Sequence, residues 1–126
     1  MSTSTSTIAH ISTVAVYVDD QERALDFWTR QVGFEKRRDE PMGEQGRWIE
    51  VAPPGSESSL VIYAKAMMPD WTERKPSVVF RCTNVEAAYR ALSGNGVAFE
   101  GPPQKMPWGP FAAFKDTEGN IFGLVG

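Results

Sequence analysis

The chain has 126 residues, of which 41% are hydrophobic and 23% are charged, as is ordinary for one soluble globular domain. A formal net charge of −3 and the lack of a basic run argue against attraction to nucleic acid or anionic lipid. No apolar run approaches the roughly 20 residues that span a bilayer. The single cysteine, Cys82, excludes an internal disulfide and is typical of a protein in the reducing cytoplasm.

The first seven residues, MSTSTST, have neither the basic segment nor the apolar segment of a secretory signal. We expect residues 1–7 to form a disordered polar tail. Residues 8–126 are then a single domain, and a cytoplasmic location is expected.

The first structured stretch is a strand over residues 11–18, indicated by its content of β-branched residues. Because side chains alternate between the faces of a strand, two sets are expected here. The uniformly apolar set should lie under a helix: Val14, Val16 and Val18. The mixed set lies on the opposite face of the strand and should face surroundings other than a helix: Thr13, Ala15 and Tyr17.

An amphipathic helix should follow, because Asp19 or Asp20 can cap its first turn and Gly33 can end it. Its apolar stripe consists of Ala24, Leu25, Phe27, Trp28 and Val32. Three further strands are predicted at residues 34–39, 47–54 and 59–65. The first half therefore has the order β-α-β-β-β.

The second half repeats this order after a proline-containing linker, residues 66–76. A strand over residues 77–82 leads to a helix that begins after Asn84 and ends near Gly94. Later strands are predicted at residues 97–99, 111–116 and 121–125. The GNG at 94–96 follows a helix, so it is a helix end and not a nucleotide-binding loop.

The sequences of the two halves align with an offset of 64 residues over the first strand and the helix of each half. Asp20 then aligns with Asn84, and Trp28 aligns with Leu92. The offset falls to 63 at Gly33 and Gly96, and to 61 at the last strand. The sequence thus predicts an α+β fold of two modules, residues 8–65 and 77–125. Their strands should form a curved mixed sheet around a central pocket, with the helices outside.

This pattern resembles the vicinal oxygen chelate superfamily, which includes glyoxalase I, extradiol dioxygenases and the bleomycin and fosfomycin resistance proteins. The resemblance rests on VYVDDQERALDFWTRQVGFE, RWIEVAPPG and FKDTEGNIFGLV, and it covers about Ile8 to Val125. It implies a homodimer, in which the modules pair either within one chain or by exchange between chains. The superfamily includes isomerases, oxygenases, transferases and non-catalytic binders, so it does not define the activity.

Metal-dependent members carry their ligands on the first and last strands of each module. The resemblance places those positions at Thr13, Ser77 and Gly123, and at Ile62, or at Tyr63 if the register slips by one. Threonine, serine, glycine and isoleucine side chains cannot complete a transition-metal site, so we predict no metal ion and no cofactor. The only histidine, His10, has the wrong strand parity relative to Thr13 and lies roughly 10 Å away along the strand.

The predicted ligand pocket combines the inward strand positions with nearby aromatic side chains. Its residues are Thr13, Tyr17, Trp48, Glu50, Ile62, Ser77, Arg81, Trp108, Phe111 and Gly123. An inward Glu50 would need a partner such as Arg81 or a ligand amine, because an unpaired buried charge is costly. Trp108, and Trp71 in the Met67–Trp71 part of the linker, could stack on a planar ligand or form a dimer contact.

Three functions agree with this pattern. The first is metal-free binding of a small aromatic or amphipathic molecule in the pocket. The second is a glyoxalase-like or dioxygenase-type enzyme, with Glu50 as the candidate general base or with metal ligands not foreseen here. The third is an interaction module with a vestigial pocket. Cys82 is expected to be a buried hydrophobe, since no histidine is placed to activate it.

Overall fold

The computed structural model describes residues 11–74 and 76–126, so the predicted tail at 1–7 and His10 lie outside the described residues. The first half contains β1 (Thr13–Val18), α1 (Gln21–Asp26), the π-helix η1 (Phe27–Gln31), β2 (Glu35–Pro41), β3 (Arg47–Ala52) and β4 (Ser59–Ala64). Two short 3-10 helices, η2 (Lys65–Met67) and η3 (Trp71–Glu73), follow in the linker. The second half contains β5 (Val78–Arg81), α2 (Val85–Gly94), β6 (Ala98–Phe99), β7 (Gln104–Met106), β8 (Gly109–Lys115) and β9 (Ile121–Val125).

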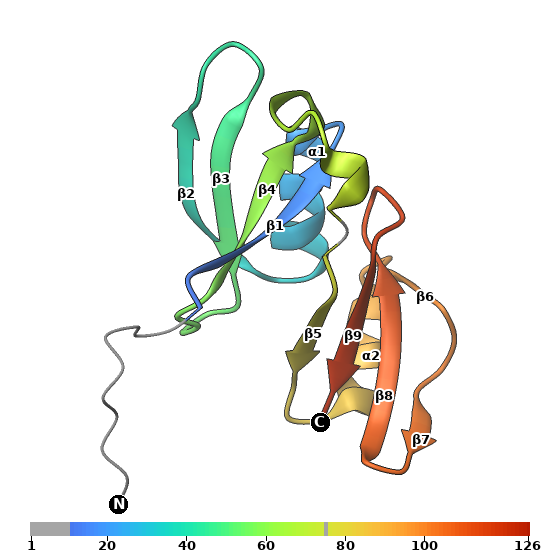
Figure 1. The fold of residues 1–126 in the computed structure, drawn as a ribbon. Helices are drawn as coiled ribbons and strands as arrows, with labels where there is room; N and C mark the ends of the chain where they lie inside the picture. The colour runs from blue at the N-terminus through green and yellow to red at the C-terminus, as the bar shows by residue number, and fades with distance from the viewer. Residues whose placement is uncertain (1–10, 75) are drawn as a thin grey trace, which may run out of the picture.

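The strands form two mixed sheets of matching topology, one from each half of the chain. The first has the order β1-β4-β3-β2 and the second has the order β5-β9-β8-β6, with β7 added beside β8. In each sheet the first strand is parallel to the last and the remaining pairs are antiparallel. The predicted α+β arrangement of two β-α-β-β-β units is confirmed, with β7 as an extra strand where the sequence indicated only a loop (Figure 1).

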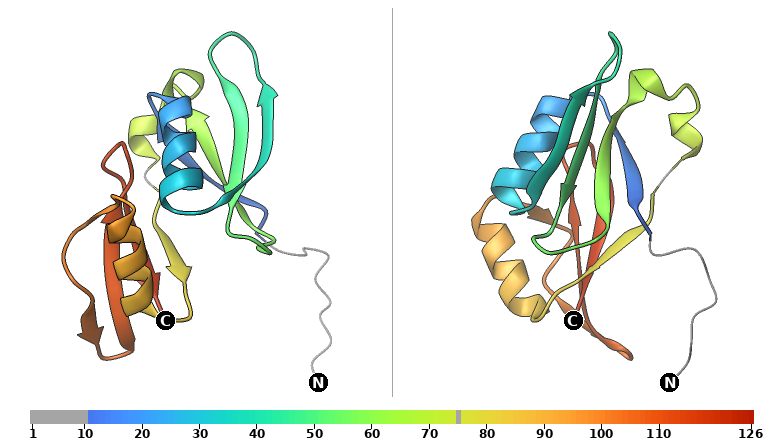
Figure 2. Two further views of the ribbon diagram at one scale, coloured as in Figure 1. Left: turned by 180° about the vertical axis from the view of Figure 1, so that it is seen from behind. Right: turned by 90° about the vertical axis from the view of Figure 1, so that its left-hand side faces the viewer.

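Both helices lie on one side of the two sheets, as Figure 2 shows. We call the other side of each sheet its open face. The helix-covered side holds the apolar core, in which Val16, Val18 and Ile49 are completely buried. The predicted helix-facing set of the first strand is confirmed, because Val14 also packs against this core, as do Val78, Phe80 and Cys82 of the second half. Burial raises the pKa of the Cys82 thiol, in agreement with an inert, half-buried side chain.

Trp28 is the side chain that joins the two halves. It has no exposed surface, and its ring centroid lies 4.9 Å from that of Phe122 and 6.0 Å from those of Phe80 and Phe114. Those three rings belong to the second sheet, whereas Trp28 lies on η1 of the first half. One core therefore extends under both sheets.

The helix ends follow the local chemistry of the sequence. Asp20 accepts a hydrogen bond from the Arg23 backbone at 3.0 Å, and Asn84 accepts one from the Ala87 backbone at 2.9 Å. Gly33 has φ of +94°, the left-handed geometry that favours glycine after a helix. Within the described ranges, no helix is long and apolar enough to cross a membrane.

An ion-pair cluster attaches α1 to the first sheet. The Arg47 guanidinium contacts Asp39 through two 2.9 Å hydrogen bonds and Glu22 through another of 2.9 Å. The hydrogen bonds from Arg47 lower the pKa of the Asp39 carboxyl. Glu22 of α1 is thus paired with a residue of the sheet.

Candidate functional site

The open face of the first sheet carries a row of aromatic side chains. Tyr63 on β4 lies between Tyr17 on β1 and Trp48 on β3, with ring-centroid distances of 5.8 Å and 6.1 Å. Both contacts are edge-to-face, the geometry that aromatic pairs favour. All three side chains are partly exposed, so the row offers a broad apolar surface to a flat molecule.

Glu50 stands at the Trp48 end of this row. The Trp48 Nε1–H donates to Glu50 Oε2 at 2.7 Å, and Arg38 Nη1 lies 3.6 Å from the same oxygen. The Glu50 side chain is 14% exposed. Within residues 11–74 and 76–126, no hydrogen bond reaches Glu50 Oε1, so this oxygen can accept one from a ligand.

The charge partner of Glu50 is therefore Arg38 and not Arg81. Arg81 is exposed on β5 and donates to the Gly126 carbonyl oxygen at 3.0 Å. Arg38 also hydrogen-bonds Glu40, and that contact raises the pKa of the Arg38 guanidinium. One guanidinium thus faces two carboxylates, which leaves a local charge of −1 at this end of the aromatic row.

Arg38 could not be predicted from the sequence as the partner of Glu50, because the direction of its side chain depends on a β-bulge. Strands β2 and β3 shift register between Lys36 and Arg38. The bulge sends Arg38 to the open face, while Arg37 donates to the Pro53 carbonyl at 3.0 Å. The adjacent arginines look equivalent in the sequence, and no local signal distinguishes them.

The open face of the second sheet is also apolar. The Phe111 ring lies across Gly123, because a Cβ placed on Gly123 would come within 2.9 Å of Phe111 Cε1 and 3.4 Å of Val79 Cγ2. Trp108 lies beside Phe111 with a ring-centroid distance of 5.8 Å. A glycine at 123 is thus required for Phe111 to lie flat on the sheet.

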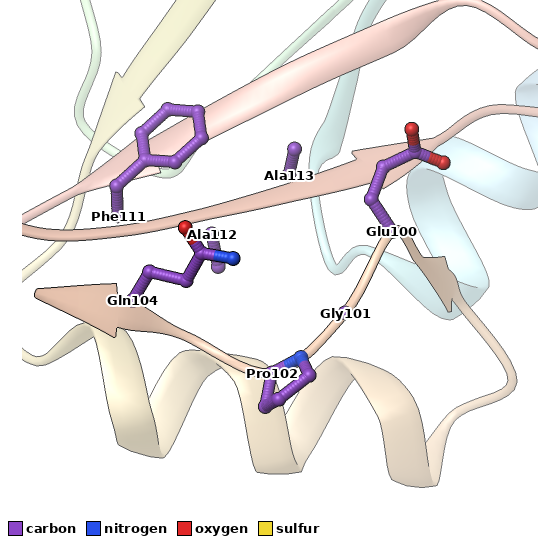
Figure 3. Close-up of a pocket in the computed structure, with 7 residues that line it drawn as sticks. All are labelled: Glu100, Gly101, Pro102, Gln104, Phe111, Ala112 and Ala113. Carbon is purple, nitrogen blue, oxygen red and sulfur yellow. The ribbon is translucent and has the colours of Figure 1, made fainter.

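A hollow of about 110 Å³ adjoins this surface, between β8 and the segment that leads into β7. Figure 3 shows its lining, which consists of Glu100, Gly101, Pro102, Gln104, Phe111, Ala112 and Ala113. Phe111 thus belongs both to the apolar open face and to a hollow with two polar side chains, Glu100 and Gln104.

The predicted inward position of Ile62 is wrong by one residue. Ile62 is completely buried in the helix-covered core and pairs with Val16. Val14 pairs with Leu60 and Val78 pairs with Phe122, so Leu60 corresponds to Phe122, an offset of 62 and not the expected 61. The counterpart of Gly123 is therefore Val61, and Tyr63, the alternative position, lies on the open face.

The structure also places the other predicted first-strand positions. Thr13 begins β1 and is partly buried, and Ser77 lies exposed directly before β5. Threonine, serine, valine and glycine at these four positions do not fit a transition-metal ion, which needs imidazole, thiolate or carboxylate donors. No group of three His, Cys, Asp or Glu side chains in the described parts of the chain could hold one.

Two tandem β-α-β-β-β units with sheets of matching topology define the fold class of this protein. Residues 7–124 match the Glyoxalase/Bleomycin resistance protein/Dioxygenase superfamily, and the chain belongs to this family. It is 50% identical to the uncharacterized protein YetH of Bacillus subtilis over 117 residues, which cover 93% of this chain and 98% of YetH.

Solved structures of the family are also similar. TnmS3, an antibiotic binding protein from Streptomyces sp. CB03234, is 38% identical with a TM-score of 0.81, and the match covers 95% of this chain and 97% of TnmS3. A superfamily member from Sphaerobacter thermophilus is 35% identical with a TM-score of 0.84, covering 94% of this chain and 97% of that chain.

Proposed function

We propose that this protein binds a planar, mostly apolar small molecule on the open faces of its sheets, without a metal ion. The observation that supports this most strongly is the exposed row Tyr17–Tyr63–Trp48, which ends at a hydrogen-bonded carboxylate. Rigid aromatic side chains on a sheet present a large contact area at low entropic cost. The similarity to TnmS3, described as antibiotic binding, supports the same class of function.

The ligand should carry a hydrogen-bond donor near the Trp48 end of its flat body. Glu50 Oε1 can accept from a phenolic hydroxyl, an amide or an ammonium group, and the local charge of −1 favours a cation. The alternative, Glu50 as a general base, would use the same oxygen, because Trp48 and Arg38 already contact the other one. We place this binding function in the cytoplasm, since the chain has a single cysteine.

We also propose that the protein is a homodimer in which a second copy covers the open face of the second sheet. Three of the large hydrophobic side chains with high exposure belong to that face or its rim: Val79 at 56%, Trp108 at 60% and Ile121 at 51%. A contiguous apolar patch of this kind marks an interaction surface in a soluble protein.

The binding proposal is tested with three planar tricyclic probes of different charge: proflavine, alizarin and anthraquinone sulfonate. A probe at about a hundred times its Kd should stabilise the protein by about 2.7 kcal/mol, which a thermal-unfolding scan detects as a higher Tm. We expect proflavine, the cation, to give the largest shift. No shift with any of the three probes would contradict the proposed function.

The dimer proposal predicts that Val79→Asp shifts the protein towards monomer. A carboxylate at the centre of a buried apolar contact must be desolvated without a partner, which costs several kcal/mol of association free energy. Sedimentation equilibrium should give twice the chain mass for the unchanged protein and the chain mass for the variant. Thr72→Asp, on the exposed linker, is the matched control and should remain dimeric. A monomeric unchanged protein would contradict the proposal.

A further inference from the structure

The turn between β8 and β9 is a rigid support for one side chain, Glu118. Asp116, which is 8% exposed, accepts 2.9 Å hydrogen bonds from the backbones of Glu118 and Asn120 and from the Asn120 side chain. Gly119 has φ of +82°, a conformation that L side chains rarely adopt. The DTEGN sequence thus builds a fixed turn, from which Glu118 extends towards the first half of the chain.

Glu118 reaches across to the first sheet with both carboxylate oxygens. Its Oε2 accepts from the Asp19 backbone N–H at 3.0 Å, directly after β1. Its Oε1 accepts from Lys65 Nζ at 3.1 Å, directly after β4, and Lys65 also donates to Asp19 Oδ2 at 3.1 Å. Because the Lys65 and Glu118 side chains are only 17% and 12% exposed, water screens this pair little.

Lys65 connects the same contact to the linker. Its Nζ lies 4.1 Å from the ring centroid of Trp71 on η3, a cation–π distance. Burial lowers the pKa of Lys65, but the hydrogen bonds to Asp19 and Glu118 outweigh this effect and raise it, so the ammonium stays charged. The linker therefore packs against a cation that is held by the second module.

This contact lies next to the aromatic row. A hollow of about 80 Å³ is lined by Tyr17, the last ring of the row, together with Lys65, Trp71 and Glu118. Arg74 and Pro76 of the linker also face this hollow and Tyr17. A movement of the linker would therefore change the surface offered to a ligand at this end of the row.

We propose that Glu118 and Lys65 form a clasp that holds linker residues 66–74 against β1 and so positions Trp71 and Tyr17 for ligand binding. The role of this clasp in positioning the binding site rests on the proposed function. The corresponding turn of the first module has no such contact: Glu57 is exposed and forms no ion pair within residues 11–74 and 76–126. Only one of the two turns thus ties the modules together at the linker.

Hydrogen exchange measured by mass spectrometry tests the clasp without any ligand. In Lys65→Met and in Glu118→Gln, peptides covering residues 66–74 should exchange at least about tenfold faster, while core peptides that contain Trp28 keep their rates. Glu57→Gln, the matched control in the other turn, should change neither. Lys65→Arg keeps the charge and should restore slow exchange. Unchanged linker exchange in both clasp variants would overturn the proposal.

Proflavine titration then links the clasp to the site. Both clasp variants should bind proflavine several-fold more weakly than the unchanged protein, and Glu57→Gln should bind it equally well. Equal binding by all four proteins, despite faster linker exchange, would overturn the positioning role. If the unchanged protein does not bind proflavine or the other two probes, the proposed function fails, and the exchange measurements still decide whether the clasp exists.

Discussion

Replacement of Trp28 by alanine is expected to lower the free energy of unfolding by about 3–5 kcal/mol. The indole has no exposed surface and lies between rings of both modules, so its loss leaves a cavity where the two halves meet. A surrounding wall made of Phe80, Phe114 and Phe122 cannot collapse without moving the second sheet. Urea denaturation of the purified protein measures the change.

Two variants separate packing from other contributions of Trp28. Its Nε1 is buried without a hydrogen-bond partner among the described residues, so Trp28→Phe removes volume and no hydrogen bond. We expect Trp28→Phe to cost clearly less than Trp28→Ala. Trp108→Ala removes the same residue type at a site that is 60% exposed, and its effect should stay within about 0.5 kcal/mol under monomeric conditions. Equal losses for Trp28→Ala and Trp108→Ala would contradict a core that spans both modules.

Trp48→Ala should weaken proflavine binding by about 30-fold or more, the loss typical of an aromatic residue at the centre of a binding surface. The variant removes one ring of the row and also the donor that orients Glu50, since Trp48 Nε1 lies 2.7 Å from the carboxylate. Trp48 is only partly buried, so stability should change far less than in Trp28→Ala. Fluorescence titration gives the Kd.

Trp48→Phe distinguishes the two contributions of this side chain. It keeps an aromatic ring in the row but removes the hydrogen bond to Glu50, so an intermediate loss of affinity is expected. Glu50→Gln keeps an acceptor oxygen and removes the charge, and it should weaken the binding of cationic proflavine more than that of alizarin, which carries no positive charge. Affinities that are unchanged in Trp48→Ala would place the ligand elsewhere on the protein.

Membership of the family does not by itself assign a reaction, because its members share a scaffold and differ in the side chains at the site. In this chain the distinguishing side chains are Tyr17, Tyr63 and Trp48 on one sheet and Phe111 on the other. Among residues 11–74 and 76–126, Glu50 is the carboxylate that accepts a hydrogen bond from a ring of the aromatic row. In the proposed function these residues contact a flat molecule, and residues 11–74 and 76–126 contain no group of three His, Cys, Asp or Glu side chains that could hold a metal ion.

Strand periodicity predicted the two faces of β1 correctly, because the pattern there is unambiguous. In β1, apolar residues alternate with a mixed set, so Val16 and Val18 could be assigned to the core and Tyr17 to the open face. In β4, every residue of SLVIYA is compatible with burial, so nothing in the strand itself distinguishes Ile62 from Val61. A shift of one residue reverses both faces of a strand, and only the pairing of β4 with β1 decides between them.

The sequence by itself determined the two β-α-β-β-β units, the helix start at Asn84 and the left-handed end at Gly33, and it limited the first helix start to Asp19 or Asp20, because these depend on local periodicity, capping and backbone conformation. The tertiary structure decided which residues meet across elements: Arg38 with Glu50, Trp28 with Phe122, and Glu118 with Lys65. Such pairs depend on a bulge, on strand register and on how two modules pack, and each of these balances contacts between segments distant in the chain. A single sequence shows the residues of such contacts but not their pairing.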